Sequence, residues 1–179
     1  MATTYKKIEL AANIAIVLVA LTLATVVVKR YVWTNKSNNN SPNPTQIKVG
    51  DRLSVSNVDW GTSDNTLVLV LQKGCRFCDE SAAFYKRLSK GLEGRSDVRI
   101  LAVLPQGESE AREYLSKLGV SFKNVVQAPP ASFGIRGTPT VMLVNQAGQI
   151  EGIWTGKLSS EQEARISEQL RLPEEAAAL

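Results

Sequence analysis

The longest apolar stretch of the chain lies close to its start. Residues 10–28 contain no charged side chain, and Asn13 is the strongly polar exception among them. As an α-helix this run would be about 28 Å long, close to the roughly 30 Å of a bilayer core. It is apolar on every side, unlike the amphipathic helices of a globular domain. We therefore predict a transmembrane helix over residues 8–28, within a membrane anchor of residues 1–30.

The alternative to a retained transmembrane helix is a cleaved signal peptide, and the length and end of this run distinguish the two. A signal peptide usually has an apolar region of about 7–15 residues that ends in small side chains. Here the run is longer and ends in valines at 26–28, which favours a retained anchor. Basic residues flank the run on both sides in similar number, so the positive-inside rule does not set its orientation.

Asn, Ser and Pro dominate residues 34–46, which contain no large apolar side chain. This composition predicts a flexible linker, which we place at residues 31–46. The folded domain is then expected over residues 47–179.

Apolar runs alternate with amphipathic stretches in the remaining chain. Residues 66–71 and 98–104 are continuous apolar runs, which predict strands buried on both faces. Apolar residues three and four positions apart predict helices over 75–92 and 107–118. The rest of the pattern predicts a short strand at 125–126, a hairpin of 140–144 with 150–155 around a turn at 145–148, and a helix from Ser159 or Ser160 to about Leu170. This order predicts an α/β sandwich with a mixed sheet.

The first two of these helices have a defined apolar stripe, which we expect to be buried. The stripe consists of Phe77, Ser81, Phe84 and Leu88 in the first helix and of Ala111, Tyr114, Leu115 and Leu118 in the second.

The distribution of charge limits the choice of partners. The net charge is +4, but residues 1–46 carry five basic and one acidic side chain, and the remaining residues carry sixteen of each. The excess lies around the apolar run, where basic residues meet lipid headgroups. A neutral domain gives no electrostatic reason to expect a nucleic-acid partner.

The absence of histidine excludes Ser-His-Asp and Cys-His nucleophile systems and every His-ligated metal. The two cysteines, Cys75 and Cys78, form a C-x-x-C motif between a predicted strand and a predicted helix. That context is typical of a redox-active dithiol. A thiolate at a helix N-terminus is stabilised by free amides and by the helix dipole, and Lys73 and Arg76 add positive charge nearby. We expect Cys75 to be the exposed nucleophile and Cys78 the resolving thiol.

Three other uses of the motif fit the sequence less well. A zinc site needs four ligands, which two thiols without histidine do not supply. A structural disulfide closing so short a loop would contribute only about 2 kcal/mol in the chain-entropy model. Attachment of a c-type haem needs a histidine after the second cysteine, where this chain has Asp79. We therefore predict no metal and no cofactor other than the disulfide itself.

Three features together resemble the thioredoxin superfamily, and in particular the membrane-anchored thioredoxin-like proteins of bacterial envelopes that include the cytochrome c biogenesis reductases. They are the opening at residues 47–53, the strand–C-x-x-C–helix unit, and Gly137-Thr138-Pro139 before an apolar strand. The resemblance covers about residues 47–170. It implies a thioredoxin-like α/β/α sandwich with an additional helix and strand at 107–127. It also implies that the Gly137–Pro139 segment is the cis-proline loop, in which Thr138 offers its backbone to an extended substrate.

The chain departs from the superfamily pattern around the motif. Gly74 stands where thioredoxins usually have tryptophan, and Phe77 where many have proline. Leu69 falls near the position of a buried acid or amide, and Ser81 holds the place of a glutamate in the cytochrome reductases. No Pro-x-x-x-Thr-x-x-Cys run of a peroxiredoxin is present.

These observations predict a membrane-anchored thiol–disulfide oxidoreductase on the extracytoplasmic, periplasmic side of the cell membrane. We expect it to exchange its dithiol or disulfide with protein substrates and to be recharged by a membrane redox-transfer partner. The sequence leaves the direction of electron flow open; for a reductant, cytochrome c or envelope-protein maturation is the candidate process. Residues 8–28 would contact lipid. The alternatives are a thioredoxin-fold binding or assembly module without turnover and, more remotely, a thiol peroxidase using Cys75.

Overall fold

A computed structural model of the chain describes residues 21–22, 46–55 and 58–173. The chain divides into two compact units, Met1–Asn43 and Pro44–Leu179, and the fold below is that of the second. The predicted transmembrane helix and linker lie outside the described residues, apart from Gln46 and the helical pair Leu21 and Thr22. Within the described ranges, no helix is both long enough and apolar enough to cross a bilayer.

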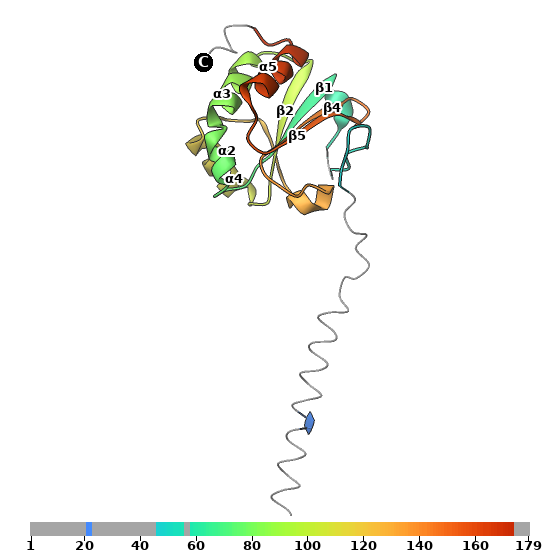
Figure 1. Cartoon of the computed structure of the whole chain (residues 1–179), viewed down its shortest axis with the longest axis vertical. Coiled ribbons are helices and arrows are strands. Elements are labelled where there is room, and N and C mark those ends of the chain that lie inside the picture. The colour runs from blue at the N-terminus through green and yellow to red at the C-terminus, as the bar shows by residue number, and fades with distance from the viewer. Residues whose placement is uncertain (1–20, 23–45, 56–57, 174–179) are drawn as a thin grey trace, which may run out of the picture. The chain divides into compact units, whose positions relative to one another are not determined.

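A mixed five-stranded sheet with the order β3-β2-β1-β4-β5 forms the centre of the folded unit (Figure 1). β1 (Asn65–Val70) runs parallel to β2 (Val98–Leu104) and antiparallel to β4 (Thr140–Asn145). β3 (Asn124–Gln127) continues the sheet in parallel beyond β2, and β5 (Ile150–Thr155) pairs antiparallel with β4. The predicted strands and the mixed sheet are confirmed.

The α-helices of the folded unit follow the predicted order, with one interruption. In the part of the chain that the structure describes they are α2 (Arg76–Glu80), α3 (Ala82–Gly91), α4 (Glu108–Lys117) and α5 (Ser160–Gln169). The predicted apolar stripe of α4 is buried. α5 begins with a capping box between Ser159 and Gln162, which satisfies two amides that would otherwise lack partners.

The single helix predicted over 75–92 is wrong, because it is interrupted at Ser81. The Ser81 hydroxyl donates a 2.8 Å hydrogen bond to the Phe77 carbonyl, four residues earlier. Such a bond competes with the backbone ladder and bends a helix. The short α2 and the longer α3 therefore present different faces, and Phe77 is 51% exposed instead of sharing the buried face of Phe84.

The two faces of the sheet are covered differently. On one face, apolar side chains of α2, α3, α4 and α5 pack with alternate residues of β1, β2 and β4 in one buried cluster. The other face is covered by apolar residues of the opening segment and by two 3-10 helices, η1 (Trp60–Thr62) and η2 (Pro130–Phe133). η2 ends after four residues, at Gly134 in the left-handed conformation that terminates helices. The expected α/β/α sandwich is therefore corrected: among the described residues, its second outer layer holds 3-10 turns and coil.

The opening segment of the unit lies against the hairpin of β4 and β5. The Gly50 amide donates to the Ile150 carbonyl at 2.8 Å, and the Ile150 amide donates to the Asp51 carbonyl at 2.9 Å. An antiparallel bridge joins Arg52 to Gln149. These contacts lie near the turn of the hairpin, so the opposite end of the sheet remains available for the dithiol.

Candidate active site

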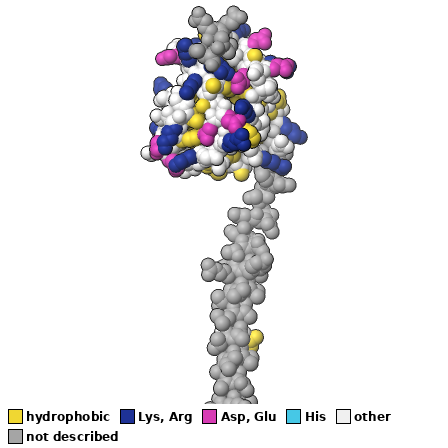
Figure 2. Space-filling view, turned by 60° about the vertical axis from the view of Figure 1, so that its left-hand side comes forward, with side chains coloured by type: hydrophobic (Ala, Val, Ile, Leu, Met, Phe, Trp, Pro, Cys, Tyr) yellow, Lys and Arg dark blue, Asp and Glu magenta, His cyan; other side chains and the backbone are white. Residues whose placement is uncertain are grey.

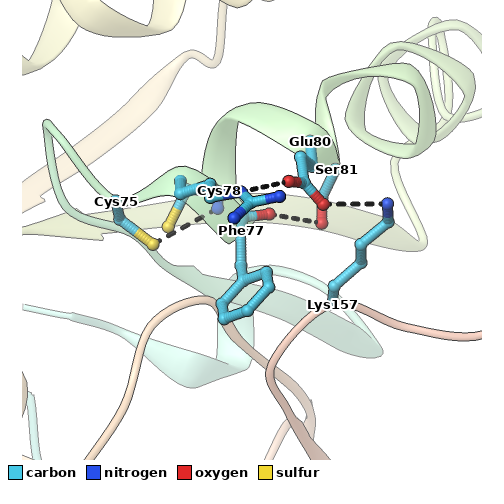
Figure 3. A network of polar contacts seen from close by, with 7 residues as sticks. Cys75, Phe77, Cys78, Glu80, Ser81 and Lys157 are labelled. Atoms are coloured by element: carbon cyan, nitrogen blue, oxygen red, sulfur yellow. Dashed lines mark hydrogen bonds and ion pairs between the residues drawn. The ribbon is translucent and has the colours of Figure 1, made fainter.

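The dithiol lies where β1 gives way to α2 (Figure 3). Cys75 is the N-cap residue of α2, and its Sγ accepts a hydrogen bond from the Cys78 amide at 3.2 Å. Both cysteines are free thiols. Gly74 precedes the motif with φ at 79°, a left-handed conformation that glycine adopts without a steric penalty. This backbone turn accounts for glycine before the first cysteine.

The two sulfurs have different environments. Cys75 is half-buried, whereas Cys78 is fully buried in the cluster that also contains Leu69. Burial raises the pKa of the Cys78 thiol to about 12, and the hydrogen bond and charge of Cys75 contribute in the same direction. An external disulfide can therefore reach Cys75, while Cys78 can react only from within.

The predicted substrate loop lies directly against the outer sulfur. The Cys75 Sγ–H donates to the Thr138 carbonyl at 3.2 Å, and the peptide bond between Thr138 and Pro139 is cis. The Thr140 hydroxyl donates to the Gly137 carbonyl at 2.8 Å, which fixes the start of β4 against the loop. Residues that are 63 positions apart in the sequence are thus in contact at the sulfur.

The basic residues of the motif are paired with carboxylates. Lys73 Nζ lies 2.6 Å from Glu110, which raises the pKa of Lys73. Arg76 Nε lies 2.7 Å from Glu80, and Lys157 Nζ lies 3.0 Å from the other oxygen of that carboxylate. Lys157 and Arg76 hold the pKa of Glu80 below its usual value. The positive charge expected beside Cys75 is therefore offset by Glu110 and Glu80.

Both ends of the β4–β5 hairpin contact this short helix. Thr138, just before β4, contacts Cys75, and Lys157, two residues after β5, contacts Glu80. The Gly156 amide donates to the Pro139 carbonyl at 2.7 Å and so joins the two hairpin ends. The ring of Phe77 points away from the polar network of Glu80 and Lys157 (Figure 3).

The sequence pattern does not identify the contacts of three polar side chains near the dithiol. The Tyr114 hydroxyl donates to the Asp79 carboxylate at 2.7 Å. Ser81 makes the hydrogen bond that ends α2. Tyr85 is 1% exposed, and its hydroxyl has no hydrogen-bond partner. A tyrosine within an apolar stripe signals a hydroxyl in need of a partner, but the sequence does not say which partner it finds.

Comparison with known proteins finds similar structures but no similar sequence family. No protein-family profile matches the chain, and no curated protein sequence matches it. The thioredoxin domain of a thiol-disulfide oxidoreductase from Bacteroides vulgatus is 17% identical over 69% of this chain and 98% of its own, with a TM-score of 0.55. A thiol:disulfide interchange protein from Bacteroides sp. is 15% identical over 73% of this chain and 95% of its own, also with a TM-score of 0.55.

A thioredoxin-family thiol:disulfide interchange protein from Chlorobium tepidum is 17% identical over 70% of this chain and 98% of its own, with a TM-score of 0.52. The predicted thioredoxin-like fold is confirmed. The fold and the site together define a thioredoxin-like domain that presents a C-x-x-C dithiol at the N-terminus of a helix. In the described part of the chain, no three Cys, Asp or Glu side chains are grouped as metal ligands would be.

Proposed function

We propose that this protein is a thiol–disulfide oxidoreductase that exchanges its Cys75–Cys78 dithiol with disulfides of other proteins. One observation carries the proposal. The half-buried Cys75 sulfur caps a helix, 3.2 Å from the Cys78 amide and 3.2 Å from the Thr138 carbonyl. A thiol so placed is exposed to a partner on one side and close to a second thiol on the other.

The proposed exchange has two steps. In the first, the Cys75 thiolate attacks one sulfur of a partner disulfide; a bond forms between these sulfurs, and the other partner sulfur leaves with the electron pair and takes up a proton. In the second, Cys78 loses its proton and attacks the Cys75 sulfur. The Cys75–Cys78 bond forms, the bond to the partner breaks, and the partner leaves as a thiol. The partner disulfide is reduced to two thiols, and the protein dithiol is oxidised.

Docking of the partner is assigned to two features beside Cys75. The loop of Gly137, Thr138 and Pro139 supplies backbone groups to an extended chain, as the resemblance implies. Phe77 supplies an apolar contact, because its side chain is 51% exposed one residue before the inner cysteine. Large exposed apolar side chains are typical anchors of protein contacts.

A trapping experiment tests the exchange. In the full-length C78S variant, the second step cannot occur, so we expect mixed disulfides between Cys75 and partner proteins that disappear on reduction. The C75S variant is the matched control, because its remaining cysteine, Cys78, is fully buried and no partner can reach it. Equal trapping by both variants, or trapping by neither, would overturn the proposal; loss of reversible dithiol cycling would point to a binding module instead.

The cellular setting is a second part of the proposal. Residues 8–28 would tether the domain to the membrane outside the cytoplasm, where disulfides persist. A membrane redox-transfer partner would recharge the dithiol, and cytochrome c or envelope-protein maturation would use it. Alkaline extraction of membranes tests the tether: a chain lacking residues 1–30 should be released and the full chain retained.

A further inference from the structure

The five-residue helix α2 is held by contacts at both of its ends. A helix this short is not stable by itself, so its position depends on what it contacts. At its start, the Cys75 Sγ–H donates to the Thr138 carbonyl at 3.2 Å. At its other end, Lys157 Nζ lies 3.0 Å from the carboxylate of Glu80, the last residue of the helix (Figure 3). Both partners flank the β4–β5 hairpin, so the hairpin and the dithiol helix are joined twice.

The two ends of the hairpin also contact each other beyond the sheet. Thr140 and Thr155 form the outermost pair of β4 and β5. Beyond this pair, the Gly156 amide donates to the Pro139 carbonyl at 2.7 Å. Pro139 belongs to the docking loop, residues 137–139, so Gly156 connects this loop to Lys157. A Cβ added at Gly156 would meet no atom within 4 Å, which shows that close packing does not fix the backbone there.

The bridge between Glu80 and Lys157 is suited to holding this segment. Both carboxylate oxygens of Glu80 are used, since Arg76 Nε lies 2.7 Å from one and Lys157 Nζ lies 3.0 Å from the other. Arg76 comes from the same helix and therefore fixes the carboxylate without contacting the hairpin. Leu158, the residue after Lys157, is buried. The bridge thus fixes the two residues that lie between the sheet and this buried leucine.

We propose that Glu80 and Lys157 are positioning residues for protein partners, because their salt bridge holds the docking loop beside the outer sulfur. A partner protein must place its disulfide at Cys75 and its extended chain on the loop at the same time. A small disulfide needs the sulfur alone. Loss of the bridge should therefore slow exchange with proteins and spare exchange with small disulfides. This inference rests on the proposed function.

The opposite charges of the two residues separate this role from simple electrostatics. E80M removes a negative charge and K157M removes a positive one, while methionine keeps the approximate length of both side chains. An effect of charge on the Cys75 thiolate, or on a charged partner, must have opposite signs in the two variants. The bridge is lost in both, so its effect must have the same sign. The reduction potential should become more oxidising in E80M and more reducing in K157M.

The experiment compares a protein disulfide with a small one. The reduced full-length chain is mixed with excess insulin, which has disulfides between its two chains, or with hydroxyethyl disulfide, which is small and uncharged. Samples are quenched by acid precipitation and redissolved with a maleimide, which adds mass to every thiol that remains on the chain. The ratio of the two second-order rates, insulin over hydroxyethyl disulfide, measures docking independently of the reactivity of the sulfur.

E80M and K157M should each lower this ratio by about threefold, the size expected for a partly exposed ion pair. The double variant should lower it no further than the lower of the two single variants, because both lose the same bridge. K157R keeps the charge and the reach of Lys157 and should restore the parent ratio.

Two matched variants control for loss of a surface ion pair. E161M and R165M break a pair within α5, and neither should change the ratio. The inference is overturned if E80M or K157M keeps the parent ratio, or if the two move it in opposite directions. It is also overturned if K157R or the controls lower the ratio as much as K157M does. Failure of the reduced parent to react with either disulfide would instead overturn the proposed function.

Discussion

The Tyr114 hydroxyl donates a 2.7 Å hydrogen bond to Asp79, the residue that directly follows the buried cysteine. The same helix, α4, supplies Glu110 to Lys73, two residues before Cys75. α4 therefore contacts the dithiol motif on both sides. The helix α4 therefore takes part in positioning the motif.

Loss of the Tyr114 hydroxyl should destabilise the domain. We expect Y114F to lower the free energy of unfolding by about 1 kcal/mol, the net contribution of a typical hydrogen bond. Urea unfolding of the reduced chain measures it. Y85F is the comparison, because that hydroxyl has no partner to lose; equal destabilisation by both variants would contradict the role of the bond to Asp79.

The charge pairs around the motif predict a reducing dithiol. A strongly oxidising dithiol depends on a stabilised reduced form, but here Arg76 is paired with Glu80 and the pKa of Cys78 is raised. We expect a reduction potential near that of thioredoxin, about −270 mV, and far from the about −120 mV of a strong oxidant. Equilibration of the full-length chain against defined thiol–disulfide buffers measures the reduction potential. A value near about −120 mV would contradict this prediction.

Removal of the Glu80 charge should shift the potential in a known direction. E80Q leaves Arg76 and Lys157 without their carboxylate, so the thiolate gains positive neighbours and the couple should become more oxidising. E161Q is the matched control, since it breaks an equally spaced pair with Arg165 on α5. A shift towards a more reducing potential in E80Q would contradict this account.

The raised pKa of Cys78 predicts how stability depends on pH. The pKa is about 12 in the folded chain against an ordinary 9.0, so the folded state holds this proton more tightly. Its contribution to stability is complete below pH about 9 and is lost as the pH rises towards about 12, by about 1.4 kcal/mol for each pH unit. The reduced parent should therefore lose more stability than C78S over this range in urea unfolding.

Phe77 should matter for protein partners and little for small ones. We expect F77S to slow exchange with a disulfide-bonded protein several-fold, because an exposed apolar anchor is lost, and to leave reaction with Ellman's reagent nearly unchanged. V49S removes another large exposed apolar side chain, which is 59% exposed, and should affect neither reaction. An equal effect of both variants would argue against a specific contact at Phe77.

Much of the fold could be predicted because its elements have strong local patterns. β1 and β2 are buried on both faces and therefore read as continuous apolar runs. α4 shows a stripe at helical spacing, and α5 begins with Ser159 three residues before Gln162. These patterns involve residues close together in the sequence, so they can be recognised in a single sequence.

The rest depends on contacts between distant residues. The helix is interrupted at Ser81, whose hydroxyl donates to the Phe77 carbonyl. Helical spacing alone predicts one uninterrupted helix here. The pairing of Lys73 with Glu110 joins residues 37 positions apart, so the positive charge expected at the motif was overestimated. The Tyr85 hydroxyl is buried without a hydrogen-bond partner. Whether a buried hydroxyl finds a partner depends on residues distant in the sequence, so no sequence pattern predicts it.

The hairpin of β4 and β5 also has a consequence for how the chain selects its strand pairing. A slip of the hairpin by one residue would turn apolar side chains to the wrong face, whereas a slip by two would restore the alternation. Core packing therefore discriminates poorly between registers two residues apart. Such a slip would move Thr138 away from Cys75 or Lys157 away from Glu80, since both ends of the hairpin meet α2. Correct chemistry at the dithiol thus depends on a register that the apolar pattern alone leaves ambiguous.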